Sequence, residues 1–194
     1  AARHRLGVDT LNGLRVAVQG VGHVGYYLCR HLAAEGAELI VADIAQESVD
    51  RVVREFGAKV IAPDGIAGAA VDIYAPCALG ATINDDSLKQ LKAKIIAGSA
   101  NNQLAEARHG EALRQRGILY APDYVINAGG VIVISHEGPA YDEAKAFTHV
   151  AQIHDTLLEI FRRADAQKMA TSEAADRLAE ERFRKPTAKA TQAA

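Results

Sequence analysis

The sequence predicts an α/β protein, a Rossmann-type doubly wound, mostly parallel sheet with C-terminal helices packed back onto it. Three observations predict this fold class. Short apolar runs alternate with amphipathic helical stretches up to residue 138, a glycine-rich turn joins the first run to the first helix, and only helical periodicity follows residue 139. With 194 residues, 49% of them apolar, the chain can bury a sizeable core.

The first β-α-β unit carries the most informative motif. An apolar run at residues 15–19 leads into Gly20-Val21-Gly22-His23-Val24-Gly25, and a second run at 38–42 is followed by Asp43. Gly20 permits the tight turn, Gly22 lets the backbone approach a pyrophosphate, and Gly25 lets the helix pack close to the strand. The helix N-terminus then favours the phosphates, and Asp43 is spaced to accept hydrogen bonds from the adenosine ribose. The alternative is a bare turn with a solvated Asp43.

The residues after the second strand indicate which nicotinamide cofactor binds. The carboxylate of Asp43 repels a ribose 2′-phosphate, and Ile44, Ala45 and Gln46 offer no cation to hold one. The sequence therefore predicts NAD rather than NADP.

The rest of the chain predicts six strands and six helices. The strands are expected at residues 15–19, 38–42, 59–62, 72–75, 94–97 and 118–121. The helices are expected at 24–35, 46–56, 86–91, 106–115, 141–166 and 171–183. Gly36, Gly57 and Gly117 are positioned to end three of these helices.

Composition excludes several classes of protein. The net charge of −2 leaves no basic surplus for nucleic acid, and no apolar run is long enough to cross a membrane. The basic N-terminus is followed by no signal-peptide core, so a cytoplasmic location is expected. Cys29 and Cys77 form no CxxC motif or paired framework, so reduced thiols and no metal site are expected.

Four segments are expected along the chain. Residues 1–13 are interpreted as a linker or the truncated end of a preceding domain, and 14–138 as an NAD-binding Rossmann domain. Residues 139–183 are expected to form helices that complete this domain, and 184–194 a flexible tail.

Several long strings of residues, in order, resemble the amino-acid dehydrogenases of the glutamate, leucine, phenylalanine and valine family, and most closely its leucine-specific members. The strings lie at residues 18–25, 72–80, 95–104, 120–132 and 174–182. The resemblance covers residues 14 to about 182, which in this family form the C-terminal cofactor domain.

The resemblance implies a cofactor site at the carboxyl ends of the strands. Ala75, Pro76, Cys77 and Ala78 would line the cofactor cleft, and Asn101 or Asn102 would contact the nicotinamide region. We interpret Cys77 as a small apolar filler rather than a nucleophile, because no histidine is paired with it in the sequence. The expected cofactor-binding residues are Gly20, Val21, Gly22, His23, Val24, Gly25, Tyr26, Asp43, Ile44, Ala75, Pro76, Cys77, Ala78, Asn101, Asn102 and Asn127.

A substrate pocket is expected around Asn127. In the family the matching asparagine lies near the amino acid, although Asn127 could instead only adopt a left-handed turn. Val131 and Ile134 lie on one face of a helical stretch and match the pair that lines the side-chain pocket. Two branched aliphatic residues suit a branched-chain amino acid, whereas a buried glutamate side chain would need a polar or charged partner.

The histidines are not assigned to catalysis. His23 is interpreted as a surface residue beside the pyrophosphate, and His136 stands where the family leads us to expect an acid. The other histidines, such as His109, His149 and His154, show no ligand spacing with one another and are expected at the surface or in packing.

The family reaction is reversible oxidative deamination of an L-amino acid to a 2-oxo acid and ammonia, in homo-oligomeric enzymes. Its catalytic lysine and aspartate come from an N-terminal domain, so no catalytic residue is expected in this chain; Lys92 and Lys94 are poor substitutes. Two alternatives remain, a stand-alone NAD-binding or sensing module without catalysis, and a fragment of a valine or phenylalanine dehydrogenase.

Overall fold

The computed structural model describes residues 1–184, so the expected flexible tail lies, apart from Arg184, outside the described residues. Six parallel strands form one sheet in the order β3-β2-β1-β4-β5-β6. The strands are β1 Arg15–Gln19, β2 Glu38–Ala42, β3 Lys59–Val60, β4 Ile73–Pro76, β5 Ile95–Ile96 and β6 Leu119–Tyr120. This order confirms the predicted doubly wound fold.

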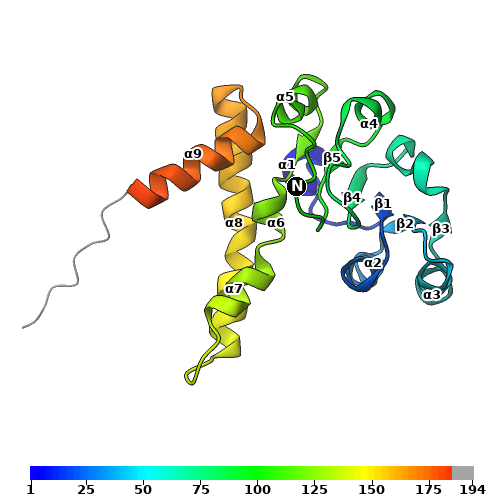
Figure 1. The fold of residues 1–194 in the computed structure, drawn as a ribbon, viewed down its shortest axis with the longest axis horizontal. Helices are drawn as coiled ribbons and strands as arrows, with labels where there is room; N and C mark the ends of the chain where they lie inside the picture. The colour runs from blue at the N-terminus through cyan, green and yellow to red at the C-terminus, as the bar shows by residue number, and fades with distance from the viewer. Residues whose placement is uncertain (185–194) are drawn as a thin grey trace, which may run out of the picture.

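Helices cover both faces of the sheet (Figure 1). Because side chains alternate along a strand, Val16 and Val18 of β1 join the core on one face and Ala17 joins the core on the other. The first face is covered by α2 His23–Ala34, α3 Gln46–Phe56 and α8 Glu143–Gln167. The second is covered by the 3-10 helix η1 Pro63–Gly68, α4 Asp85–Gln90 and α5 Arg108–Gln115.

The C-terminal helices pack back onto the sheet, as predicted. Leu157, Ile160 and Phe161 of α8 are buried in the same core as the strand residues. α8 has 25 residues, and Figure 1 shows α7, Gly129–Ser135, beside its first part and α9, Thr171–Arg184, beside its last part. The short helix α6, Asp123–Ile126, leads from β6 towards α7.

The predicted boundaries are wrong at several places. β3, β5 and β6 pair over two residues each, so the four-residue strands predicted there are too long. The helix predicted from residue 106 begins at Arg108, and the N–H of Glu106, just before it, donates to the ring of His109. Gly36, Gly57 and Gly117 do have positive φ values, 79°, 66° and 69°, which confirms the predicted helix ends.

One helix that the sequence does not predict lies in the segment expected to be a linker. α1, Ala2–Leu6, is fixed by contacts with distant parts of the chain. His4 lies 2.9 Å from a carboxylate oxygen of Asp165, and Arg5 donates to the carbonyl of Gly117. Within residues 1–184, no helix has both the length and the apolar character needed to cross a membrane.

Candidate functional site

The candidate site lies at the carboxyl ends of β1 and β4, where the strand order reverses and a doubly wound sheet leaves a crevice. The backbone N–H of Cys77 donates to the carbonyl of Gln19 at 2.7 Å, and that of Ala100 to Pro76 at 2.9 Å. Three consecutive strand ends, those of β1, β4 and β5, are therefore tied together at this edge.

The glycine turn after β1 has a different steric requirement at each glycine. Gly20 has a φ of 90°, and a Cβ there would lie 2.7 Å from the Cβ of Ala78. A Cβ on Gly25 would lie 2.0 Å from the carbonyl oxygen of Gly20, so α2 could not approach the turn so closely. A Cβ on Gly22 would meet no atom within 4 Å. The space over Gly22 is therefore open for a ligand to approach the backbone.

The N-terminus of α2 faces this open space. Gly22 is the N-cap residue and provides no side chain to accept hydrogen bonds from the first turn. The first N–H groups of a helix have no acceptor within the helix, and the helix dipole makes this end positive. His23 and Val24, the first residues of α2, are exposed here. The turn can thus hold a phosphate group through backbone N–H groups.

Asp43 connects the end of β2 to the glycine turn. Its Oδ2 accepts a hydrogen bond from the N–H of Val21 at 2.7 Å, and its Oδ1 accepts one from the N–H of Ala45 at 2.9 Å. These bonds fix the carboxylate, and each oxygen keeps a second lone pair for an incoming hydroxyl. Ile44 beside it is 95% exposed and offers an apolar surface to a flat ring.

The loop after β4 forms the next wall of the site. Ala75 and Pro76 are buried, Cys77 is half-buried and Ala78 is exposed. Burial raises the pKa of the Cys77 thiol above its ordinary value, while hydrogen bonds from Ser99 act in the opposite direction. A protonated thiol fits the interpretation of Cys77 as a filler, because a nucleophile requires the thiolate.

Two of the predicted asparagines lie in direct contact. The Nδ2 of Asn127 donates to the Oδ1 of Asn101 and, at 3.3 Å, to the carbonyl of Ser99. Asn127 has a φ of −98°, so the alternative of a left-handed turn is wrong for this residue. Asn102 does adopt a positive φ, 52°, and its backbone N–H donates to Asp123.

Val131 and Ile134 share one face of α7, but both side chains are exposed, 73% and 64% respectively. Within the described residues they therefore form an open apolar surface next to Asn127 in the sequence rather than an enclosed pocket.

Several residues that position the site are not singled out by the sequence. Gln103 is fully buried, and its Nε2 donates to the carbonyls of Gly98 and Ala100, both at 2.9 Å. Asp123 accepts a hydrogen bond from the hydroxyl of Tyr120 at 2.8 Å as well as from the backbone of the loop. Gln103 and Asp123 lie inside the strings that carry the family resemblance, which is the one signal that pointed to them.

A cavity of about 260 Å³ adjoins the glycine turn between the first turns of α2 and α3. The residues that line it are Val21, Gly22, His23, Tyr26, Tyr27, Ser48 and Arg51. Ser48 and Arg51 are not among the residues that the sequence predicts at the site.

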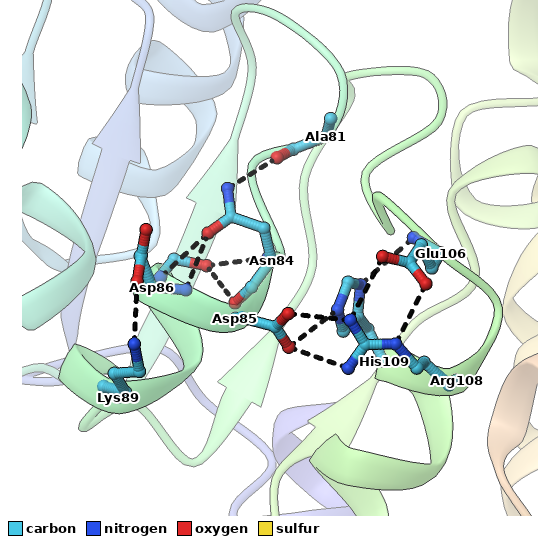
Figure 2. Close-up of polar contacts among 9 residues, drawn as sticks. Ala81, Asn84, Asp85, Asp86, Lys89, Glu106, Arg108 and His109 are labelled. Carbon is cyan, nitrogen blue, oxygen red and sulfur yellow. Dashed lines mark hydrogen bonds and ion pairs between the residues drawn. The ribbon is translucent and has the colours of Figure 1, made fainter.

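A cluster of possible metal ligands lies between α4 and α5 and consists of Asp85, Glu106 and His109 (Figure 2). Arg108 already donates two bonds to Asp85, at 2.8 and 2.7 Å, and two to Glu106, at 2.9 and 3.1 Å. The Nδ1 of His109 accepts from the N–H of Glu106, so its Nε2 carries the proton and faces Asp85. Every ligand atom is thus engaged, and we interpret the cluster as an ion-pair network.

The remaining histidines lie mainly in packing or at the surface. His109 is buried, whereas His23 is exposed and lies against the ring of Tyr27. His136 and His149 form a contact that the sequence does not predict, with ring nitrogens 3.0 Å apart.

Known proteins resemble this chain over most of its length. Residues 42–184 match the model of the Glutamate/Leucine/Phenylalanine/Valine dehydrogenase family. The chain is 56% identical over 183 residues to a leucine dehydrogenase of Bacillus cereus, covering 94% of this chain and 50% of that protein. It is 44% identical over 186 residues to a valine dehydrogenase of Streptomyces coelicolor, covering 94% and 51%. The chain thus spans about half the length of the curated relatives it matches.

Solved structures share the fold. The crystal structure of L-tryptophan dehydrogenase from Nostoc punctiforme superposes with a TM-score of 0.91 at 49% identity, over 94% of this chain and 56% of that one. A hetero-hexameric glutamate dehydrogenase from Thermus thermophilus superposes with a TM-score of 0.69 at 24% identity, over 93% and 48%, which shows the fold alone.

Proposed function

This chain belongs to the Glutamate/Leucine/Phenylalanine/Valine dehydrogenase family, and from that premise we propose that it is the NAD-binding part of a branched-chain L-amino acid dehydrogenase. The family consists of NAD(P)-dependent dehydrogenases with a Rossmann fold. The observation that carries the proposal is the pairing of an open space over Gly22 with the fixed carboxylate of Asp43.

These residues fit a dinucleotide. The N–H groups at the start of α2 would hold the pyrophosphate over Gly22, and the free lone pairs of Asp43 would accept the ribose hydroxyls. The exposed side chain of Ile44 would cover the adenine. The nicotinamide would then lie towards Ala75, Cys77 and the asparagines. When bound, NAD supplies the acceptor for the hydride that leaves the α-carbon of the amino acid.

The substrate class rests on α7. We propose that Val131 and Ile134 form one wall of an aliphatic pocket, which a second domain closes, and that Asn127 orients the substrate beside the nicotinamide. Their exposure supports this, because an apolar surface of this kind is suited to pack against another part of an enzyme. No catalytic role is proposed for a residue of this chain.

Assembly and location form part of the same proposal. We propose a homo-oligomeric enzyme, on the ground of family membership, and a cytoplasmic location. Cys29 and Cys77 are free thiols, which suits a reducing compartment.

The first test is a fluorescence titration of this chain with NADH, with NADPH in parallel. Saturable NADH binding at least 10-fold tighter than NADPH binding is expected. Equal binding of the two would overturn the role of Asp43, and no binding would overturn the proposed site. A chimera that joins this chain to the N-terminal half of the Bacillus cereus leucine dehydrogenase should then deaminate leucine, whereas an NAD-binding module unrelated to catalysis would bind NADH and remain inactive in the chimera.

A further inference from the structure

The geometry points to a second determinant of the choice between NAD and NADP, an inference that rests on the proposed function. Arg51 lies where it could bind a 2′-phosphate, and contacts with Glu55 and Tyr26 hold its guanidinium in a different arrangement. We call these three residues the Tyr26–Arg51–Glu55 triad. Arg51 and Glu55 lie on α3, and Tyr26 lies on α2.

The location of Arg51 brings a cation close to the cofactor ribose. Arg51 lines the 260 Å³ cavity together with Gly22, His23 and Ser48. Val21, on the same wall, donates its N–H to Asp43, the proposed acceptor for the ribose hydroxyls. A phosphate on the ribose 2′ position would therefore extend from Asp43 towards this cavity. A guanidinium with a neighbouring hydroxyl is a common donor set for phosphate, because both present N–H or O–H groups to its oxygens.

The triad holds this cation in another arrangement. The guanidinium carbon of Arg51 lies 3.6 Å from the centroid of the Tyr26 ring, which is a cation–π contact. The Nε of Arg51 donates to Glu55 Oε1 at 3.2 Å, and the Tyr26 hydroxyl donates to Glu55 Oε2 at 2.5 Å. Both oxygens of Glu55 are thus engaged, and the carboxylate is fixed beside the guanidinium.

The protonation of the triad supports the same arrangement. The hydrogen bond from Tyr26, followed by that from Arg51, lowers the pKa of Glu55, so this carboxylate is ionised at neutral pH. The negative charge of Glu55 offsets the positive charge of Arg51 next to the cavity. The triad therefore weakens the attraction of Arg51 for a 2′-phosphate, which acts in the same direction as the repulsion from Asp43. The choice of cofactor thus depends on α3 as well as on the end of β2.

The test compares the affinities of wild-type chain and variants for NADH and NADPH, measured by fluorescence titration. Glu55→Gln removes the charge that offsets Arg51, and we expect NADPH to bind about 3- to 10-fold tighter, with NADH changed less than about 2-fold. Tyr26→Phe keeps the ring and removes only the hydroxyl, so a smaller gain in the same direction is expected. Displacement of NADH by 2′-AMP and by 5′-AMP gives a second measurement, in which only 2′-AMP should gain affinity.

Two controls separate the triad from a general change in charge. Glu47→Gln removes one negative charge from the first turn of the same helix, and it should leave the NADPH-to-NADH affinity ratio within about 2-fold of wild type. In the double variant Glu55→Gln/Arg51→Gln the gain should disappear, because the cation that produces it is gone.

The outcomes distinguish this inference from the proposed function. If NADH binds to the wild type but Glu55→Gln leaves the NADPH affinity unchanged, or if the gain persists in the double variant, the triad has no role in selectivity. If NADH does not bind to a wild type that is folded by circular dichroism, the proposed function fails, and the inference fails with it.

Discussion

The Nδ2 of Asn127 donates a hydrogen bond to the Oδ1 of Asn101, and this joins the loop that follows β5 to the segment that follows β6. The Nδ2 of Asn101 makes no hydrogen bond with another of residues 1–184, so it can donate to a ligand. The two asparagines thus form one polar unit at the proposed nicotinamide end of the site.

Replacement of Asn127 by Ala should affect turnover far more than cofactor binding. The NADH affinity of the chain should change less than about 3-fold, since the phosphates and ribose are held elsewhere, whereas kcat of the leucine dehydrogenase chimera should fall about 100-fold through loss of orientation. Gln115→Ala, which removes a surface amide on α5, is the matched control and should change neither quantity. A chimera with Asn127→Ala and undiminished kcat would remove Asn127 from the substrate site.

Substitution by Ala should mainly lower the stability at Gly25 and mainly weaken NADH binding at Gly22. Gly25→Ala places a Cβ 2.0 Å from the carbonyl oxygen of Gly20, so we expect a loss of about 3 kcal/mol or more and a Tm lower by about 6–12 °C. Gly22→Ala meets no atom within 4 Å and should cost less than about 1 kcal/mol, but it should weaken NADH binding about 10-fold because the methyl group fills the phosphate space. Thermal unfolding and NADH titration of both variants check this pair. Unchanged NADH affinity of Gly22→Ala would place the pyrophosphate elsewhere.

The two cysteines should resist alkylation in the folded chain. Burial raises the pKa of Cys29 to about 12, and burial also raises that of Cys77. Because the thiolate is the reactive form, iodoacetamide at pH 8 should label neither residue quickly, and both should react after unfolding in guanidinium chloride. Mass spectrometry counts the labels. Fast labelling of Cys77 in the folded chain would contradict its interpretation as a filler.

The ion-pair network of α4 and α5 should persist to low pH. Hydrogen bonds from Arg108, with a smaller effect from His109, lower the pKa of Asp85 from its ordinary value of 3.8 to about 2. The stabilising effect of this carboxylate is therefore present above pH 3.8 and is lost as the pH falls through about 2. In the Arg108→Gln variant the pKa of Asp85 should return towards 3.8, as measured by the NMR shift of its carboxyl carbon. Arg114→Gln, on the same helix, should leave that pKa unchanged, and an equal response of both variants would argue against the specific pair.

Local sequence signals account for the central elements of the fold. β1, β2 and α3 begin and end at the predicted residues, because short apolar runs define the two strands and Gly57 ends the helix, all within a few positions of sequence. The outer strands are shorter than predicted, since the extent of β3 and β6 depends on how many residues of a neighbouring strand lie opposite. α1 depends on contacts of His4 and Arg5 with residues more than 100 positions away, which no local pattern contains.

In the candidate site, too, some features follow from local sequence and others from tertiary packing. The steric requirements at Gly20 and Gly25 could be predicted because each is a local requirement of the turn, whereas the ribose contact of Asp43 stays a prediction. The proximity of Arg51 to Gly22 could not, because it results from the packing of α3 against α2 and not from the residues next to Asp43. The contact between Asn101 and Asn127 likewise depends on the arrangement of two loops.

The buried amide of Gln103 has a consequence for how such a protein can change over generations. It holds the loop at residues 98–100 from within the core, and this hold is independent of the contact that Asn127 makes with the carbonyl of Ser99. Substitutions at ligand-facing positions other than Asn127 can therefore accumulate while the amide of Gln103 keeps this loop in place. Because a buried residue helps to fix the loop, the same fold can acquire new ligand specificities in small steps that are each tolerated, provided that position 103 keeps a side-chain amide.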